Sequence, residues 1–144
     1  MKIFFDTSVL GPALIKVMPN HPRAAPWLER VRTGQDVMVV SNHNLAELYS
    51  FLSRIPLKPP IPALAIWKLI AETVLPLSEV VTLTVTDYRE TIERMATAGL
   101  TGGIVYDALI ARAAEKAKVD KLVTFNVAHF REVWPEGGTR FVAP

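Results

Sequence analysis

Short apolar runs alternate along the chain with longer segments in which apolar residues recur at helical spacing. Brief apolar runs are typical of strands, and the longer period is typical of amphipathic helices. The first run is continuously apolar after Lys2, which predicts a strand buried on both faces. The pattern predicts strands at 2–5, 36–40, 80–83 and 121–124, and a weaker edge strand at 140–142.

Helical spacing fills the intervals between these runs and predicts helices at 8–17, 22–33, 43–54, 62–75, 87–98, 104–118 and 127–133. Residue types common at helix ends support these bounds: first-turn prolines (Pro22, Pro62), C-terminal glycines (Gly34, Gly99) and a pair resembling a capping box (Asp87, Glu90). The proline-rich segment 55–62 predicts a loop between two helices.

Strands that alternate with helices predict an α/β fold with a mainly parallel sheet of four to five strands. In such sheets, ligands bind beyond the carboxyl ends of the strands. The length of 144 residues fits one domain over residues 1–144, large enough to bury a core without cross-links.

Composition narrows the class of protein further. Half of the residues are hydrophobic, which argues against disorder, and the absence of cysteine excludes disulfides and thiolate zinc sites. Asp6 and Thr7 interrupt any apolar signal segment after Lys2, and no apolar run approaches the length of a membrane span, about 20 residues. We therefore expect a cytoplasmic protein without a membrane partner.

The overall charge is a weak indicator of the partner. The formal net charge is +2 and the isoelectric point about 9.0. A polyanionic partner fits this balance, and so does an ordinary protein surface.

Two carboxylates stand where an α/β fold binds ligands. Asp6 directly follows the first predicted strand, where it serves either a site at the sheet edge or the N-cap of the next helix. Asp107 lies on the apolar face of its helix with Ala111 and Ala114, while most charges of that helix lie opposite. A carboxylate on a buried face needs a cation, a donor or a metal, although a helix dipole also stabilises an acid in the first turn.

Two further residues are ambiguous by themselves. Glu47 lies about 100° from Leu48 on its helix, which also fits a solvated flank. Asn126 follows the fourth predicted strand, just after Thr124, and an asparagine in a turn is common. If these side chains meet, their oxygen atoms form a ligand set that suits Mg²⁺ or Mn²⁺ rather than zinc.

Four pieces spanning nearly the whole chain carry a family resemblance: Ile3-Phe-Phe-Asp-Thr-Ser8, Ala46-Glu-Leu48, Tyr106-Asp-Ala-Leu-Ile-Ala111, and Leu122-Val-Thr-Phe-Asn126 followed by His129-Phe130. In this order they resemble the PIN domain, and within it the VapC-type ribonuclease toxins of bacterial and archaeal toxin–antitoxin pairs. The resemblance implies a three-layer α/β/α sandwich with a mainly parallel sheet.

The resemblance also implies an activity, the hydrolysis of RNA phosphodiester bonds with Mg²⁺ or Mn²⁺ and an activated water. On the family pattern Asp6, Glu47 and Asp107 are catalytic acids that bind the metal, and Thr7 and Thr124 support them through hydrogen bonds. Many members have an aspartate where this chain has Asn126. The amide can still coordinate through its oxygen but brings no charge, so a second metal would bind more weakly.

Partners follow from the same resemblance: an RNA substrate, a cognate antitoxin whose tail lies across the active-site groove, and a second copy in a homodimer. Trp27, Phe51 and Trp67 are candidates for an apolar groove, with ordinary core packing as the alternative. His129 is a candidate substrate contact because it lies close to Asn126 in the sequence. His21 and His43 fit surface or capping positions.

Two other hypotheses stay open. A catalytically weak PIN-fold module that binds RNA or protein is compatible with Asn126. A receiver-like or phosphatase-like domain with Asp6 as an aspartyl nucleophile is compatible with the position of Asp6, although Ser8 stands where a second aspartate would be expected. The leading hypothesis remains the metal-dependent endoribonuclease of a type II toxin–antitoxin pair.

Overall fold

A computed structural model describes residues 1–144 and contains one five-stranded, entirely parallel sheet. The strands are β1 (Lys2–Phe5), β2 (Val37–Ser41), β3 (Ser78–Val81), β4 (Lys121–Val123) and β5 (Phe141–Val142), in the order β3-β2-β1-β4-β5. The predicted α/β class with a parallel sheet is confirmed, and so is the short fifth strand at the edge. The central strand, β1, pairs with β2 on one side and with β4 on the other.

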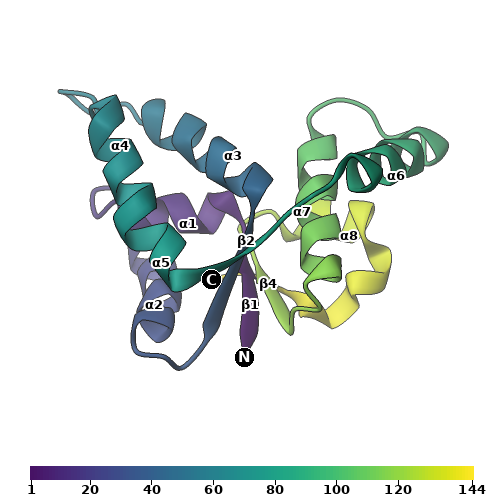
Figure 1. The fold of residues 1–144 in the computed structure, drawn as a ribbon, viewed down its shortest axis with the longest axis horizontal. Helices are drawn as coiled ribbons and strands as arrows, with labels where there is room; N and C mark the ends of the chain where they lie inside the picture. Colours follow the sequence, from purple (N-terminus) through teal and green to yellow (C-terminus); the bar gives the residue numbers. More distant parts are fainter.

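Helices cover both faces of the sheet and make the three-layer sandwich (Figure 1). One face carries α1 (Thr7–Leu14), α2 (His21–Arg32), α3 (Asn42–Ser53), α4 (Ala63–Leu69) and α5 (Leu75–Leu77). The other carries α6 (Val85–Thr97), α7 (Ile104–Lys116), α8 (Val127–Val133) and a 3₁₀ segment (Pro135–Arg140) that sequence periodicity does not predict. None of the helices combines the length and apolar character needed to cross a membrane.

The apolar run of β1 supplies both layers of core. Ile3 and Phe5 pack into a cluster with α1, α2 and α3, whereas Phe4 packs on the opposite face with α7 and α8. All three side chains are completely buried. Successive side chains in a strand point to opposite faces, so a strand covered on both sides must be apolar at every position.

The predicted helix 62–75 is longer and less regular than its period suggests. The helical path continues from α4 through a π-helical turn (Ile70–Val74) into α5 and then directly into β3, which begins at Ser78 rather than at residue 80. In the wide turn the backbone N–H of Leu75 donates to the carbonyl of Ile70. Pro76 follows at once, and a wider turn accommodates a ring that would clash with a regular helix.

The predicted capping box of α6 is wrong by one turn. Thr84, not Asp87, occupies the N-cap, and Asp87 is the third helical residue whose carboxylate accepts from the Thr84 backbone N–H. An equivalent box, Ser41 with Asn44, begins α3. Pro62 is the residue before α4 rather than its first residue. Gly34 and Gly99 follow their helices with positive φ, as the C-cap prediction requires.

Candidate active site

The carboxyl edge of the sheet opens into a pocket of about 240 Å³. Asp6 reaches it from the end of β1, Glu47 from α3, Asp107 from the first turn of α7 and Asn126 from the end of β4. The remaining lining residues are Thr7, Ser8, Phe51 and Arg54. The three acids and Asn126, which lie far apart in the sequence, therefore line one pocket.

Asp6 is held by hydroxyl groups from the first turn of α1 and from the residue that follows β4. Its Oδ2 accepts from Ser8 Oγ at 2.5 Å and from Thr124 Oγ1 at 2.6 Å. The residue occupies the N-cap position of α1, but its side chain does not cap the helix. Burial raises the pKa of the Asp6 carboxyl, and the Ser8 and Thr124 hydrogen bonds oppose that rise. The two hydroxyl groups thus orient a carboxylate whose charged form is destabilised by burial.

Two backbone groups lock the same hydroxyls in place. The N–H of Asn126 donates to Thr124 Oγ1 at 2.9 Å, and the N–H of Phe125 donates to Ser8 Oγ at 3.2 Å. The Asn126 side chain makes no capping hydrogen bond to α8 and lines the pocket. Its amide is consequently available to a ligand.

Glu47 is not the solvated helix flank that its helical position allowed. Its Oε2 is buried without a hydrogen-bond partner, and the closest approach to His43 Nε2, also without a partner, is 3.6 Å. Burial and, next, the charges of Asp6 and Asp107 raise the pKa of Glu47 to about 7. A hydrogen bond with the Thr7 hydroxyl and the charge of Arg54 act in the opposite direction. Thr7 is fixed in turn by Asn44 Nδ2 at 3.3 Å.

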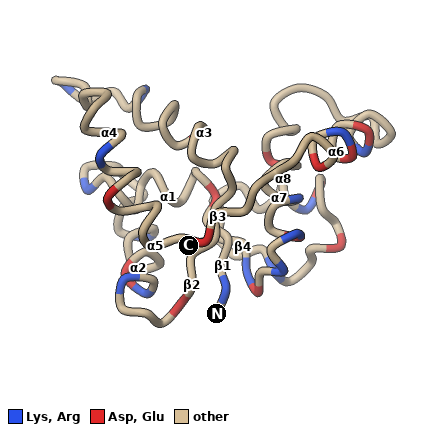
Figure 2. Tube along the Cα trace, viewed as in Figure 1, with Lys and Arg blue, Asp and Glu red and all other residues tan.

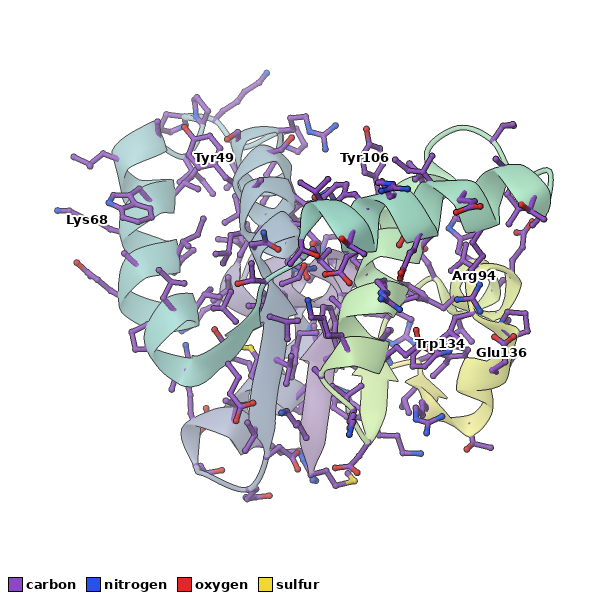
Figure 3. All side chains as sticks on the ribbon, turned by 45° about the vertical axis from the view of Figure 1, so that its right-hand side comes forward. Tyr49, Lys68, Arg94, Tyr106, Trp134 and Glu136 are labelled. Atoms are coloured by element: carbon purple, nitrogen blue, oxygen red, sulfur yellow. The ribbon has the colours of Figure 1, made fainter.

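The expectation for His43 as a surface or capping residue is wrong, because its side chain is only 16% exposed. Its ring stacks on Tyr106 with centroids 5.6 Å apart, and its Nδ1 lies 3.5 Å from the Tyr88 hydroxyl. Burial lowers the pKa of His43. Tyr106 projects from the first turn of α7 at the upper edge of the molecule (Figure 3). The sequence signal was the four-residue spacing of His43 and Glu47, which puts both on one helix face.

Asp107 faces the pocket from the first turn of α7. Burial and the charge of Asp6 raise the pKa of its carboxyl, while His129 lowers it. His129 Nδ1 lies 3.1 Å from Asp107 Oδ2, so the histidine that was a candidate substrate contact touches one of the acids. A carboxyl group whose pKa is raised by burial and by a neighbouring acid gains from the presence of a cation.

These residues fit a hard divalent cation by donor chemistry. They offer carboxylate and amide oxygens, three carboxyl groups with raised pKa, and one buried oxygen without a partner. No three acidic or histidine side chains lie close enough to surround one ion directly. Magnesium keeps several of its waters and usually takes only one or two carboxylates directly, so this spacing suits an ion bound partly through water.

Arg54 was not identified as a site residue from the sequence, although it lines the pocket. Phe51 lies four residues after Glu47, and Arg54 lies seven residues after Glu47. At helical spacing the three side chains therefore share one face of α3, with Arg54 at its carboxyl end. The same spacing could have identified Arg54 once Glu47 was accepted as a site residue. Of the candidates for an apolar groove, only Phe51 lines the pocket, whereas Trp67 is 53% exposed on α4 and Trp27 packs against the core.

Three solved structures share this fold at low sequence identity. VapC20 of Mycobacterium tuberculosis is 20% identical with a TM-score of 0.64, over 83% of this chain and 86% of its own. FitAcB of Neisseria gonorrhoeae is 19% identical with a TM-score of 0.65, over 91% and 92%. VapBC2 of Rickettsia felis is 18% identical with a TM-score of 0.62, over 100% and 98%.

Comparison of whole sequences gives a clear answer only at the level of the family. No curated protein matches the sequence significantly. The profile of the PIN domain, in contrast, matches residues 3–133, which include α3, α7, β4, all of β1 but its first residue, and every residue of the pocket. The chain therefore belongs to the PIN domain family.

Proposed function

We propose that this protein is a Mg²⁺- or Mn²⁺-dependent endoribonuclease and the toxin of a type II, VapC-type toxin–antitoxin pair acting in the cytoplasm. The observation that carries the proposal is the convergence of Asp6, Glu47 and Asp107 on one pocket at the carboxyl edge of the sheet. Membership of the PIN domain family supports a nuclease. It also sets aside the receiver-like or phosphatase-like hypothesis.

In this proposal Asp6, Glu47 and Asp107 hold the metal, with the Asn126 amide oxygen as a neutral fourth ligand. A bound divalent ion would polarise the phosphodiester and lower the pKa of the attacking water. The Ser8 and Thr124 hydroxyls keep Asp6 Oδ2 in a fixed direction, so its other oxygen is the one free to turn to the ion. His129 Nδ1 restrains Asp107 in the same way.

The names of the structural neighbours support the substrate and the partners. VapC20 is described as a toxin that cleaves the sarcin–ricin loop, and VapBC2 as a complex bound to a DNA fragment from its promoter. By analogy we propose an RNA substrate, a cognate antitoxin, and a homodimer of the toxin. The exposed Trp67 and the pocket-lining Phe51 are the residues we propose for antitoxin contact.

Cleavage of a labelled RNA in Mg²⁺ or Mn²⁺ tests the activity. Asp6→Asn and Asp107→Asn should each reduce the rate at least about 100-fold, because each removes a charge that holds the metal. Asp120→Asn is the matched control, since Asp120 stands just before β4 at the opposite edge of the sheet and should leave the rate unchanged. Equal cleavage by all four proteins would refute the proposal.

A second candidate function is a PIN-fold module that binds RNA or protein without cutting. The wide spacing of the acids and the neutral Asn126 favour it. Calorimetric titration with Mn²⁺, run beside the cleavage assay, separates the two functions. Tight Mn²⁺ binding with Mn²⁺-dependent cleavage rules the module out, whereas RNA binding with neither supports it. Asn126→Asp should tighten Mn²⁺ binding in both cases.

A further inference from the structure

Arg54 is the one basic side chain that lines the acidic pocket. It follows the last residue of α3, and helical side chains lean toward the amino end of their helix. The long Arg54 side chain therefore reaches back along α3 toward Phe51 and Glu47, which line the same pocket. Its charge is felt at Glu47, whose pKa it lowers.

The guanidinium of Arg54 is held at one point only. Its Nε donates to the Ser50 carbonyl at 3.2 Å, and its two terminal nitrogens make no hydrogen bond or ion pair in the structure. The side chain is exposed rather than packed. Arg54 is thus oriented along the helix while the outer edge of its fork stays free.

Other basic groups near carboxylates are engaged. Arg30 pairs with Asp36, and Arg112 and Lys116 both pair with Asp87. Lys and Arg are spread over both halves of the molecule, with basic positions at the far end of α3 (Figure 2). An arginine that lies in a pocket with three carboxylates and pairs with none of them is consequently unusual in this chain.

An RNA strand brings a phosphate at every nucleotide, so the phosphate next to the reacting one needs a partner of its own. A guanidinium fork matches two phosphate oxygens in geometry and charge. We infer that Arg54 binds the phosphodiester group adjacent to the bond that is cut, and so sets the position of a single-stranded RNA across the pocket. This inference rests on the proposed function and adds a substrate-binding residue to it.

Equilibrium binding of a fluorescent single-stranded RNA, measured by anisotropy, tests this role without turnover. The protein carries Asp107→Asn to prevent cleavage, and binding is measured in Mg²⁺ between about 50 and 200 mM salt. Adding Arg54→Gln should weaken binding about tenfold and reduce the slope of log K against log salt by about 0.7, the value for one phosphate contact on a single strand. Arg54→Lys should keep the slope but bind more weakly than arginine, because it keeps the charge and loses the fork.

Arg32→Gln is the matched control. It makes the same change of charge at an exposed position of α2, and should alter neither the affinity nor the slope by as much. The unfolding midpoint of each variant shows that the protein is folded. An unchanged affinity and slope in Arg54→Gln would overturn the inference.

The outcome separates this inference from the proposed function. Without the Asp107 substitution, Arg54→Gln should raise KM for RNA more than it lowers kcat. If the unsubstituted protein does not cut RNA but Arg54→Gln still lowers affinity and slope, the nuclease proposal fails and the phosphate contact stands. If Asp6→Asn abolishes cleavage while Arg54→Gln leaves KM, affinity and slope unchanged, only the Arg54 inference fails.

Discussion

Asp6 and Glu47 line the same pocket but differ in their hydrogen-bond partners. Two hydroxyl groups hydrogen-bond to Asp6 Oδ2, whereas Glu47 Oε2 is buried without any partner. The chain thus fixes one carboxylate by itself and leaves the other in need of a proton or a cation.

The raised pKa of Glu47, about 7, gives a pH dependence with a definite sign. Between about pH 4.5 and 7 the folded protein binds more protons at Glu47 than the unfolded chain, so this group makes the free energy of unfolding fall as pH rises. Glu47→Gln removes the effect. Because the side chain is 34% exposed, we discount the full shift and expect the variant to be more stable at pH 8 by about 1–2 kcal/mol.

Urea unfolding in EDTA measures this difference across the pH range. The advantage of Glu47→Gln over the natural sequence should be small at pH 4.5 and grow until about pH 7. Glu93→Gln, at an exposed position of α6 without an ion pair, should show no such growth. A difference that does not change with pH would contradict the assignment of the burial effect to Glu47.

Single residues also show where sequence interpretation succeeds. Asp107 could be singled out because a charge on an apolar helix face is visible in the periodicity itself. Periodicity did not single out Glu47 or His43, because their burial depends on α7 bringing Tyr106 against α3, and Glu47 was predicted only from the family resemblance. A supporting hydrogen bond from the Thr124 hydroxyl could be expected from its residue type. That Asp6 is the acceptor follows from the pairing of β1 with β4.

Among the elements, α6 and α7 are joined through one buried carboxylate. Asp87, the third residue of α6 in the capping box with Thr84, also accepts from Lys116 Nζ at 2.7 Å and Arg112 Nε at 3.0 Å, both on α7. The Lys116 hydrogen bond is the main cause that holds the pKa of Asp87 far below its usual value, and the Thr84 and Arg112 bonds add to it. This contact fixes the helix that carries Asp107 against its neighbour.

Asp87→Asn should lower the free energy of unfolding at neutral pH by about 2–3 kcal/mol, because two cations lose a buried partner. An aspartate with a lowered pKa stabilises the fold above about pH 3.8 and loses that effect as pH falls below it. The variant and the natural sequence should therefore converge in acid. Glu90→Gln, which breaks an exposed pair with Arg112, should change stability by less than about 1 kcal/mol at pH 7.

The packing of α1 on α3 depends on a glycine. A Cβ atom at Gly11 would lie 2.2 Å from Cε1 of Phe51, whose ring lines the pocket. Alanine normally stabilises a helix interior relative to glycine, by about 0.5–1 kcal/mol. At Gly11 the clash reverses that sign.

Gly11→Ala should accordingly destabilise the protein by about 1–3 kcal/mol through overpacking. A double-mutant cycle with Phe51→Ala measures the coupling, since the cost of Gly11→Ala should largely vanish once the ring is gone. Thermal or urea unfolding of the four proteins gives the values. If Gly11→Ala destabilises equally in both backgrounds, the ring is not the cause.

The elements themselves were largely readable from the sequence, and their ends less so. Apolar runs indicated all five strands, most accurately the largely buried β1, β2 and β4, whereas the partly exposed β3 was predicted two residues too late. The helix at 62–75 ran on through a π-turn to Leu77, since Pro76 disturbs the hydrogen bonds without interrupting the apolar spacing. The cap of α6 was misplaced because two pairs of residues have the three-residue spacing of a capping box. Thr84 and Asp87 form the reciprocal hydrogen bonds, whereas Asp87 and Glu90 share only the spacing.

For the molecule as a whole, strand order decides that a site exists. The order β3-β2-β1-β4-β5 places β1 in the centre, so that Asp6 lies between the connection leading to Glu47 and the one leading to Asn126. Hydrophobic patterns give the sequence of elements but not their neighbours in the sheet. The family resemblance could therefore suggest that the acids converge, but only the folded structure shows them in one pocket.

A cation that binds this pocket should stabilise the whole fold. At a free Mn²⁺ concentration about 100 times the Kd, binding adds about 2.7 kcal/mol, which corresponds to a rise of about 5–10 °C in Tm for a chain of this size. Calorimetric unfolding with and without Mn²⁺ measures the rise. Asp107→Asn should abolish it and Asp120→Asn should keep it, so an equal rise in both would place the ion elsewhere.

The hydrogen bond that the Thr124 hydroxyl donates to Asp6 joins residues that lie 118 positions apart in the chain. A ribosome makes Asp6 long before the segment from Thr124 to Asn126. Until that segment has emerged, Asp6 lacks one of its two hydroxyl partners, and the pocket lacks Asn126. A nascent chain that has not yet reached Asn126 therefore lacks a complete pocket, so that any activity of this pocket must wait until translation has passed that residue.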